Sequence, residues 1–142
     1  MWFEDLSPCT YFPTEVPLTA VGWLDADHHF TTGPVDRIVY DALIALLANP
    51  WQPLVAMGPH QCNLCRFKPE ARGSANLFLP AGRIMYVSPE MILHYINAHG
   101  YAPPKCFCDA ALSCPPMRSM NYLRAVRNAG GARMLTQSGS EV

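Results

Sequence analysis

Apolar residues recur at helical spacing between residues 35 and 47. Steps of three and four place side chains on one face of an α-helix, so the pattern predicts an amphipathic helix. Pro34 suits the first helical position, and Asp36 in the first turn complements the helix dipole. Asn49 and Pro50 end the helix, because the residue before a proline is disfavoured in the helical conformation. The predicted apolar stripe consists of Val35, Ile38, Val39, Ala42, Leu43, Leu46 and Leu47.

The segments on either side of this helix have strand and loop patterns. Residues 1–24 are interrupted by prolines and carry spaced apolar side chains, which predicts short extended segments packed on a core. Residues 25–33 form a polar loop. Further on, residues 76–79 and 83–87 flank Pro80-Ala81-Gly82, which predicts a β-hairpin with Gly82 at positive φ. A polar loop over residues 66–74 precedes that hairpin.

Three more helices are predicted in the second half of the chain. Ser88, Pro89 and Glu90 have the residue types of an N-cap, a first helical position and an acidic first turn. The helix that they start continues through Ile96 and ends at Gly100, which suits a helix C-terminus. Shorter helices are expected over 107–112 and over 117–128, where Gly130-Gly131 closes the last one. The tail from residue 136 is expected to be frayed.

The composition limits the class of protein. Half of the 142 residues are hydrophobic, and 15% are charged, against roughly 25% in an ordinary soluble domain. The formal net charge of −1 excludes a general polyanion binder. The first residues lack the features of a secretory signal, and no apolar stretch approaches the ~20 residues of a membrane span. We therefore expect a cytoplasmic protein, where paired cysteines more often bind metal than form disulfides.

Two cysteines and two histidines have the spacing of a zinc site. Cys62 and Cys65 precede His94 and His99 in the pattern C-x2-C-x28-H-x4-H. Zinc takes four N or S ligands in a tetrahedron, and a two-residue gap lets both thiolates of one turn reach the ion. Side chains five residues apart on an ideal helix point about 140° away from each other. Both imidazoles can therefore share an ion only if the last turn loosens, which Gly100 permits.

Alternatives to this ligand set remain open from the sequence alone. His60, Cys106 or Cys108 could take the place of His99, and a lone C-x-x-C can also be two buried thiols. A thioredoxin-like redox pair is disfavoured, because Cys62 lacks the preceding strand and following helix of such a site. Four protein ligands would leave no open coordination position, so we expect Zn²⁺ with a structural role.

A second polar cluster precedes the first helix. Asp25, Asp27, His28 and His29 lie within five residues of one another, and Asp25 with His28 is a possible second polar site. This cluster supports the hypothesis of a metal-dependent hydrolase. The simpler interpretation is a turn in which Asp25 bonds its own backbone and His28 packs beneath Trp23.

The C-terminal 28 residues are basic. They hold four arginines and one glutamate, a formal charge of +3. Such a helix could contact nucleic acid or an acidic protein, although a solvated helix face is the default interpretation. The arginines are Arg118, Arg124, Arg127 and Arg133.

Four phrases of the sequence resemble a family of small uncharacterised bacterial proteins. The phrases are FEDLSPxTY at residues 3–11, GWLDxxHxF at 22–30, GxHxCxxC at 58–65 and HYIxxHxYxPPxxF at 94–107. The resemblance covers roughly residues 3–112 and carries no established activity. It implies a compact domain with Cys62, Cys65, His94 and His99 at zinc-ligand positions. The chain departs from the family pattern at Cys9 and in its basic C-terminal extension.

These observations together predict an α+β fold. A single small domain over residues 1–114 would contain a zinc-bound β-hairpin plus helix, a ββα-like and Cys2His2-like unit packed on the amphipathic helix. Residues 115–142 would be a basic helical extension with a frayed tail. The low charge content favours a non-enzymatic, zinc-stabilised module that binds another protein or itself through an apolar patch. A nucleic-acid-binding zinc-finger-like protein is the first alternative, and a hydrolase using residues 25–29 is the second.

Overall fold

The computed structural model of the chain describes residues 1–54, 58–65 and 72–137. Residues 66–71 of the predicted polar loop and 138–142 of the predicted tail lie outside the described residues. Five strands and five helices are found in the part described. In chain order they are β1 (Thr19–Ala20), α1 (Arg37–Leu47), β2 (His60–Gln61), β3 (Arg72–Gly73), β4 (Asn76–Ala81), β5 (Ile84–Pro89), α2 (Ile92–His99), α3 (Lys105–Ser113), α4 (Met120–Asn128) and α5 (Ala132–Gln137).

Two small sheets organise the fold. The larger has the strand order β1-β5-β4, in which β5 runs antiparallel to β4 and parallel to β1. The second is the antiparallel pair β2–β3. Pro80 lies in the edge strand β4, where a residue without an N–H group is tolerated. Helices and largely antiparallel strands in one small domain confirm the predicted α+β class.

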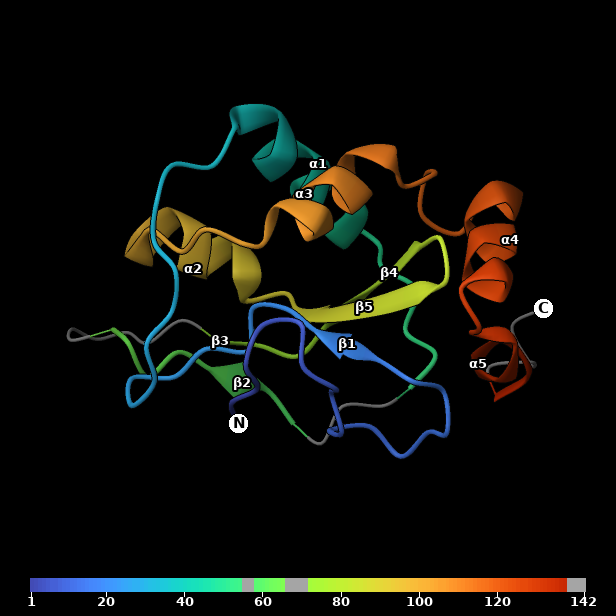
Figure 1. Ribbon diagram of the computed structural model, residues 1–142, viewed down its shortest axis with the longest axis horizontal. Helices are drawn as coiled ribbons and strands as arrows, with labels where there is room; N and C mark the ends of the chain where they lie inside the picture. The colour runs from blue at the N-terminus through green and yellow to red at the C-terminus, as the bar shows by residue number, and fades with distance from the viewer. Residues whose placement is uncertain (55–57, 66–71, 138–142) are drawn as a thin grey trace.

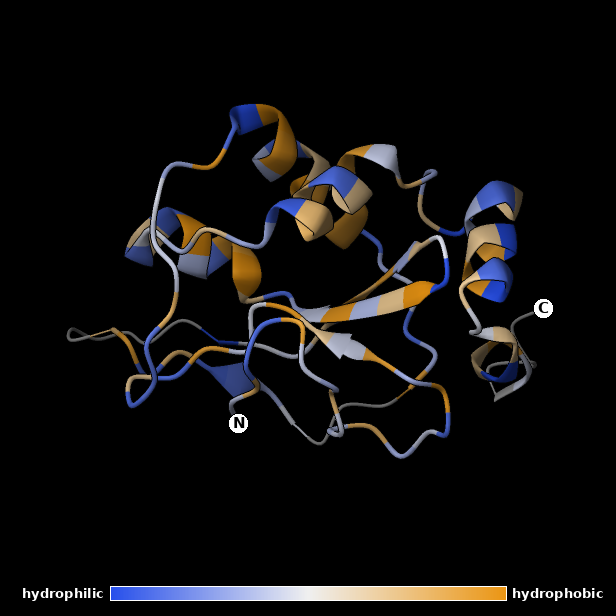
Figure 2. Cartoon of the chain, in the orientation of Figure 1, coloured by the Kyte–Doolittle hydropathy of each residue, from blue (hydrophilic) through white to orange (hydrophobic). Residues whose placement is uncertain are grey.

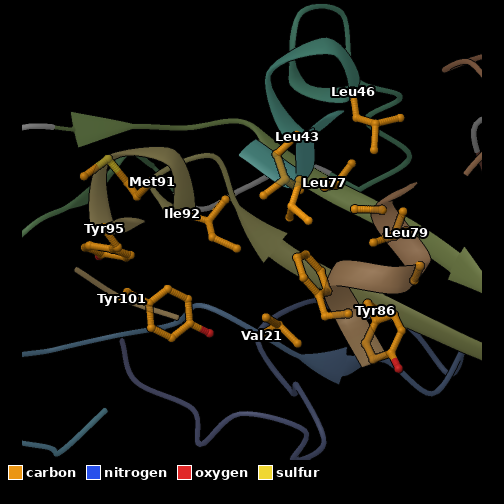
Figure 3. Packing of buried hydrophobic residues seen from close by; sticks show 14 of the residues in the cluster. Val21, Leu43, Leu46, Leu77, Leu79, Tyr86, Met91, Ile92, Tyr95 and Tyr101 are labelled. Atoms are coloured by element: carbon orange, nitrogen blue, oxygen red, sulfur yellow. The ribbon is translucent and has the colours of Figure 1, made fainter. Parts of the chain in front are cut away.

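The central hairpin is buried on both faces, so alternate side chains enter two different cores. Leu77 and Leu79 of β4 pack in the cluster beneath α1, α2 and α3, together with Tyr86 of β5. Phe78 and Val87 point the other way, into a cluster shared with the N-terminal segment and the C-terminal helices. Because successive strand residues face opposite sides of a sheet, this hairpin joins the two cores. Figure 3 shows part of the first cluster around Leu43, Leu77, Tyr86 and Ile92.

The helices divide between these two cores. In Figure 1, α1, α2 and α3 lie on one side of the β4–β5 hairpin, α4 lies beside its turn, and α5 follows next to α4. Helix α1 contacts both α2 and α3, so the predicted packing of the second helix on the first is confirmed. The N-terminal segment covers the opposite face through Phe12 and Trp23.

The hairpin prediction is confirmed with a shift in its turn. The register pairs Ala81 with Ile84, so the loop is Gly82-Arg83, and Pro80 and Ala81 belong to β4. Gly82 has φ 57°, as expected for the left-handed region.

The predicted helix starts are wrong in three places. Helix α1 begins at Arg37, because Asp36 is the N-cap and accepts a hydrogen bond from the Ile38 N–H at 3.3 Å. Ser88 and Pro89 belong to β5, where Ser88 pairs with Leu77, so the ladder overrides their capping preference. Helix α4 begins after the N-cap Ser119, not at residue 117.

Some predicted apolar positions are on the surface. Ile38 of the predicted α1 stripe is 58% exposed, whereas Val39, Leu43 and Leu46 of that stripe are buried. Met120, the first residue of α4, is 79% exposed. Figure 2 shows hydrophilic positions over much of α4.

The C-terminal helices contribute to the second core. Tyr122, Val126 and Met134 are buried, and the Tyr122 hydroxyl donates to the Phe78 carbonyl at 2.5 Å. Helix α5 includes residues 136 and 137, which were expected to be frayed. The domain boundary at residue 114 stays a prediction, but α4 packs directly on β4. None of the described helices combines the length and the apolar character that a membrane span requires.

Candidate metal centre

The structure brings the two cysteines and two histidines into one cluster. One ligand atom each from Cys62, Cys65, His94 and His99 lies within 4.8 Å of the others. Cys62 Sγ is 3.4 Å from His99 Nε2, and Cys65 Sγ is 3.2 Å from His94 Nε2 and 3.6 Å from His99 Nε2. Bond lengths of about 2.3 Å to sulfur and 2.0–2.1 Å to nitrogen in a tetrahedron put S and N roughly 3.6 Å apart. The observed spacing is therefore close to that of one shared ion, and the four residues lie close enough to hold a metal.

The cysteines are held by a turn that follows β2 and precedes β3. His60 pairs with Gly73 and Gln61 with Arg72, which fixes the chain immediately before Cys62. The Leu64 N–H donates to Cys62 Sγ at 3.4 Å, an interaction that stabilises a thiolate. The cysteines thus belong to a second ribbon and not to the predicted hairpin over residues 76–87.

Helix α2 brings its two histidines together by widening its last turn. The N–H groups of Gly100 and Tyr101 both bond to the Tyr95 carbonyl, in place of the regular bond to the fourth preceding residue. Gly100 has φ 67°, which ends the helix at His99 as the sequence predicted. The rings of His94 and His99 lie with their centroids 5.0 Å apart. The expected loosening of the last turn is therefore present.

Burial gives the ligands complementary protonation preferences. Burial raises the pKa of the Cys62 thiol, so the side chain by itself disfavours the thiolate. Burial, followed by the neighbouring His99, lowers the pKa of His94 and favours the neutral imidazole that binds metals. A cation in the centre would lower the pKa of the Cys62 thiol and so favour its thiolate. The same cation would bind His94 in the neutral form that burial already favours.

The alternative ligands lie outside the cluster. His60 Nε2 is 3.0 Å from the Tyr95 hydroxyl, and its ring packs edge-on against Trp23. Cys106 is exposed, and the Cys108 thiol donates to the Pro103 carbonyl at 3.7 Å. In the part of the chain that the structure describes, the four-residue cluster is the single group of this kind.

The Asp25 loop forms a pair of side chains next to the cysteine turn. Asp25 Oδ1 is 2.7 Å from His28 Nδ1 and also accepts from the Asp27 N–H at 3.1 Å. The predicted backbone bond of Asp25 is therefore present. His28, however, stacks on Trp2 with centroids 3.8 Å apart, so its predicted packing beneath Trp23 is wrong.

This pair does not complete a metal cluster among the described residues. Burial raises the pKa of Asp25, but the hydrogen bond and charge of His28 bring it below the usual value. Asp25 is thus an ionised partner for His28 at neutral pH.

Sequence reasoning missed the residues that support the centre. Asn63, between the two cysteines, accepts a hydrogen bond from the Ala26 N–H at 2.9 Å and so attaches the Asp25 loop to the turn. Tyr95, between the two histidines, is fully buried and contacts both their rings. The position of Asn63 and Tyr95 inside the two ligand pairs was the available signal.

The model of the family named Domain of unknown function (DUF7919) matches residues 1–112. The chain belongs to the DUF7919 family. The DUF7919 region contains all four clustered residues and the Asp25 loop, whereas α4 and α5 lie beyond its end. Neither the curated proteins nor the solved structures include a significant match to the chain.

Proposed function

We propose that this DUF7919 protein is a zinc-stabilised, non-enzymatic module. The observation that carries the proposal is the convergence of two sulfurs and two imidazole nitrogens within 4.8 Å of one another. Thiolate and imidazole together favour Zn²⁺ over hard cations such as Mg²⁺ and Ca²⁺, which prefer oxygen ligands. The ligands proposed for Zn²⁺ are Cys62, Cys65, His94 and His99.

The four-ligand set supports a structural role. Four protein ligands complete a tetrahedral shell and leave no position for an activated water. The ion would connect the turn after β2 to the end of α2. Zinc sites of this type contribute about 10–16 kcal/mol of apparent binding free energy, which becomes folding free energy.

We propose that the module acts by binding another protein or a second copy of itself. Support comes from large apolar side chains on the surface and from the low charge content. Among the residues that the structure describes, the exposed large apolar ones are Met1, Leu6, Ile38, Ile44, Ile84, Leu112 and Met120. The six cysteines are free, which agrees with a reducing compartment, so the cytoplasm is the proposed location.

Nucleic-acid binding through the basic helices has less support. Arg118 donates to the carbonyls of Asn49 and Pro50, and Arg133 pairs with Glu15. Arg124 donates to Asn121 Oδ1 at 3.4 Å, so three of the four arginines have partners within the chain. Hydrolysis by the Asp25 loop also has less support, because Asp25 and His28 are not members of the metal cluster.

Metal analysis of the purified full chain tests the proposal. We expect one zinc per chain in the natural sequence and none in Cys62→Ser or His94→Ala. Cys106→Ser is the matched control, since this thiol is exposed and outside the cluster. A folded natural chain without zinc, or equal zinc loss in the control, would refute the assignment.

Sedimentation measures the self-association arm. A second copy as partner predicts a dimer that Ile38→Glu weakens, because a stable interface must bury about 1,000 Å² or more. A monomer at all accessible concentrations would leave a different protein as the proposed partner.

A further inference from the structure

A cavity lies beside the candidate metal centre. Its volume is about 350 Å³, and its lining comes from the N-terminal segment, the β2–β3 ribbon and the start of β4. Cavities that bind small molecules and cofactors in proteins are about 300–1,000 Å³. This volume suits a small molecule and is too small for a protein segment or a nucleic-acid strand.

The cavity is polar but has no charged side chain among its described lining residues. Polar groups come from His60, Asn63, Ser74 and Asn76, and aromatic surface comes from Tyr11, which packs on the buried Trp23 ring. Met1 also lines the cavity; burial and, after it, the charged α-amino group of Met1 lower the pKa of His60, so a cationic ligand is disfavoured. The lining side chains offer hydrogen bonds and no counter-charge, which suits a ligand without formal charge.

Counting bonds among the described residues alone, His60, Asn63 and Asn76 are each held in place by a hydrogen bond and keep one further hydrogen-bonding group for a ligand. His60 uses Nε2 for the Tyr95 hydroxyl, and among the described residues its Nδ1 makes no hydrogen bond. Asn63 uses Oδ1 for the Ala26 N–H, which leaves its amide N–H₂ as a donor. Rigid support of this kind lowers the entropy cost of binding.

Asn76 supplies an acceptor. It is only 4% exposed, and its amide nitrogen donates to the Ser74 carbonyl. No described side-chain nitrogen or oxygen is both fully buried and unpaired. Among the described residues the Asn76 side-chain oxygen accepts no hydrogen bond, and Asn76 lines the cavity, so this oxygen is the acceptor that we assign to the ligand.

The aromatic wall favours a flat ligand. The rings of Tyr11 and Trp23 lie 5.4 Å apart, and the Trp23 indole N–H is fixed by the Val87 carbonyl at 3.0 Å. Aromatic surface beside an amide donor and an amide acceptor matches the face and the edge of a neutral heterocycle.

We propose that this cavity binds a neutral planar heterocycle of the nucleobase type, through His60, Asn63 and Asn76 at its edge and Tyr11 along its face. The cavity wall includes the cysteine turn itself, since Asn63 lies between Cys62 and Cys65. Binding therefore depends on the metal, and this part of the proposal rests on the proposed zinc centre.

The proposal is tested by titrating the full chain with adenine, guanine, cytosine and uracil. Binding is monitored by the NMR signals of the Trp23 indole and the Asn side-chain amides. We expect at least one base to bind and to shift these signals. His60→Phe keeps a ring beside Trp23 and Tyr95 but removes the ring nitrogens, and should weaken binding about tenfold. Asn63→Ala is the second variant, with the same expectation.

The controls separate the two proposals. Arg83→Ala, in the hairpin loop and outside the cavity lining, should bind the base unchanged. Benzene, which is flat but has no hydrogen-bonding edge, should not compete. If a sample with one zinc per chain binds none of the bases, or binds benzene equally, the cavity proposal is overturned and the zinc centre stands. If the base binds equally to a zinc-free sample, the dependence on the metal is overturned.

Discussion

Replacing Tyr101 by phenylalanine tests a contact between distant parts of the chain. The buried Tyr101 hydroxyl donates to Asp5 Oδ2 at 2.7 Å, and Asp5 Oδ1 accepts from the Gly22 N–H at 3.0 Å. The contact ties the N-terminal segment to the connection between α2 and α3. A hydrogen bond to a charged group contributes about 1.5–3 kcal/mol, so Tyr101→Phe should lower the free energy of unfolding by about that amount. For a chain of this length the unfolding midpoint should fall by roughly 5–10 °C.

The size of the loss should depend on pH. Burial raises the pKa of Asp5, while the bonds from Gly22 and Tyr101 partly oppose the increase. The folded chain therefore binds this proton more tightly than the unfolded chain does, and the ionised carboxylate disfavours folding above the raised pKa. That unfavourable contribution is relieved as the pH falls through the raised value towards the ordinary 3.8.

Tyr101→Phe should raise the pKa of Asp5 further, because it removes a bond that lowers it. The stability difference between natural chain and variant should thus be largest at neutral pH. It should shrink to about 0.5–1.5 kcal/mol once the carboxyl is protonated, since the bond is then between neutral groups.

Urea unfolding of both chains across the acidic range measures this difference. The control compares Asp5→Asn with the double variant Asp5→Asn and Tyr101→Phe. Because an amide does not titrate, the stability difference between these two chains should not depend on pH. A loss that is the same at every pH, or below about 0.5 kcal/mol at neutral pH, would refute the reasoning.

Three further predictions concern metal, backbone and the C-terminal helices. A chelator should lower the unfolding midpoint of the natural chain, because the free energy of zinc binding is lost. The unfolding midpoint of Cys62→Ser should not change. A natural chain whose midpoint the chelator leaves unchanged would contradict the zinc centre. Gly22→Ala should cost about 1–2 kcal/mol from its φ of 80°, plus the strain of a tight contact, because a Cβ would lie 3.1 Å from Ser88 Oγ. Urea unfolding should show a smaller loss for Gly82→Ala, whose Cβ would meet open space; equal losses would count against the contribution of the tight contact. Tyr122→Ala should cost about 3–5 kcal/mol in the same assay, and a near-neutral result would mean that α4 does not support the core.

Local patterns predicted the elements that depend on neighbouring residues. The α1 stripe, the hairpin turn at Gly82 and the end of α2 at Gly100 follow from spacing and backbone preference. The four clustered side chains were found from their spacing alone, because their residue types and the helix end restrict the geometry.

Contacts between distant residues could not be predicted in this way. The parallel pairing of β1 with β5 joins Thr19 to Tyr86, and no local signal specifies such a partner. Ser88 has the preference of a helix cap, but its ladder with β4 outweighs that preference. The burial of Tyr122 depends on the face of the hairpin that α4 covers, which the sequence of α4 does not reveal.

The hairpin lies wholly between the two ligand pairs, and this arrangement affects the order of assembly. The segment between Cys65 and His94 holds 28 residues, and closing a flexible loop of that length costs about 3 kcal/mol in chain entropy. Once β4 and β5 have paired, most of this segment is already folded back on itself, and the remaining cost of bringing the ligands together is small. Ion capture by the nascent chain should therefore follow strand pairing, and the affinity for the ion should report how completely the sheet has formed.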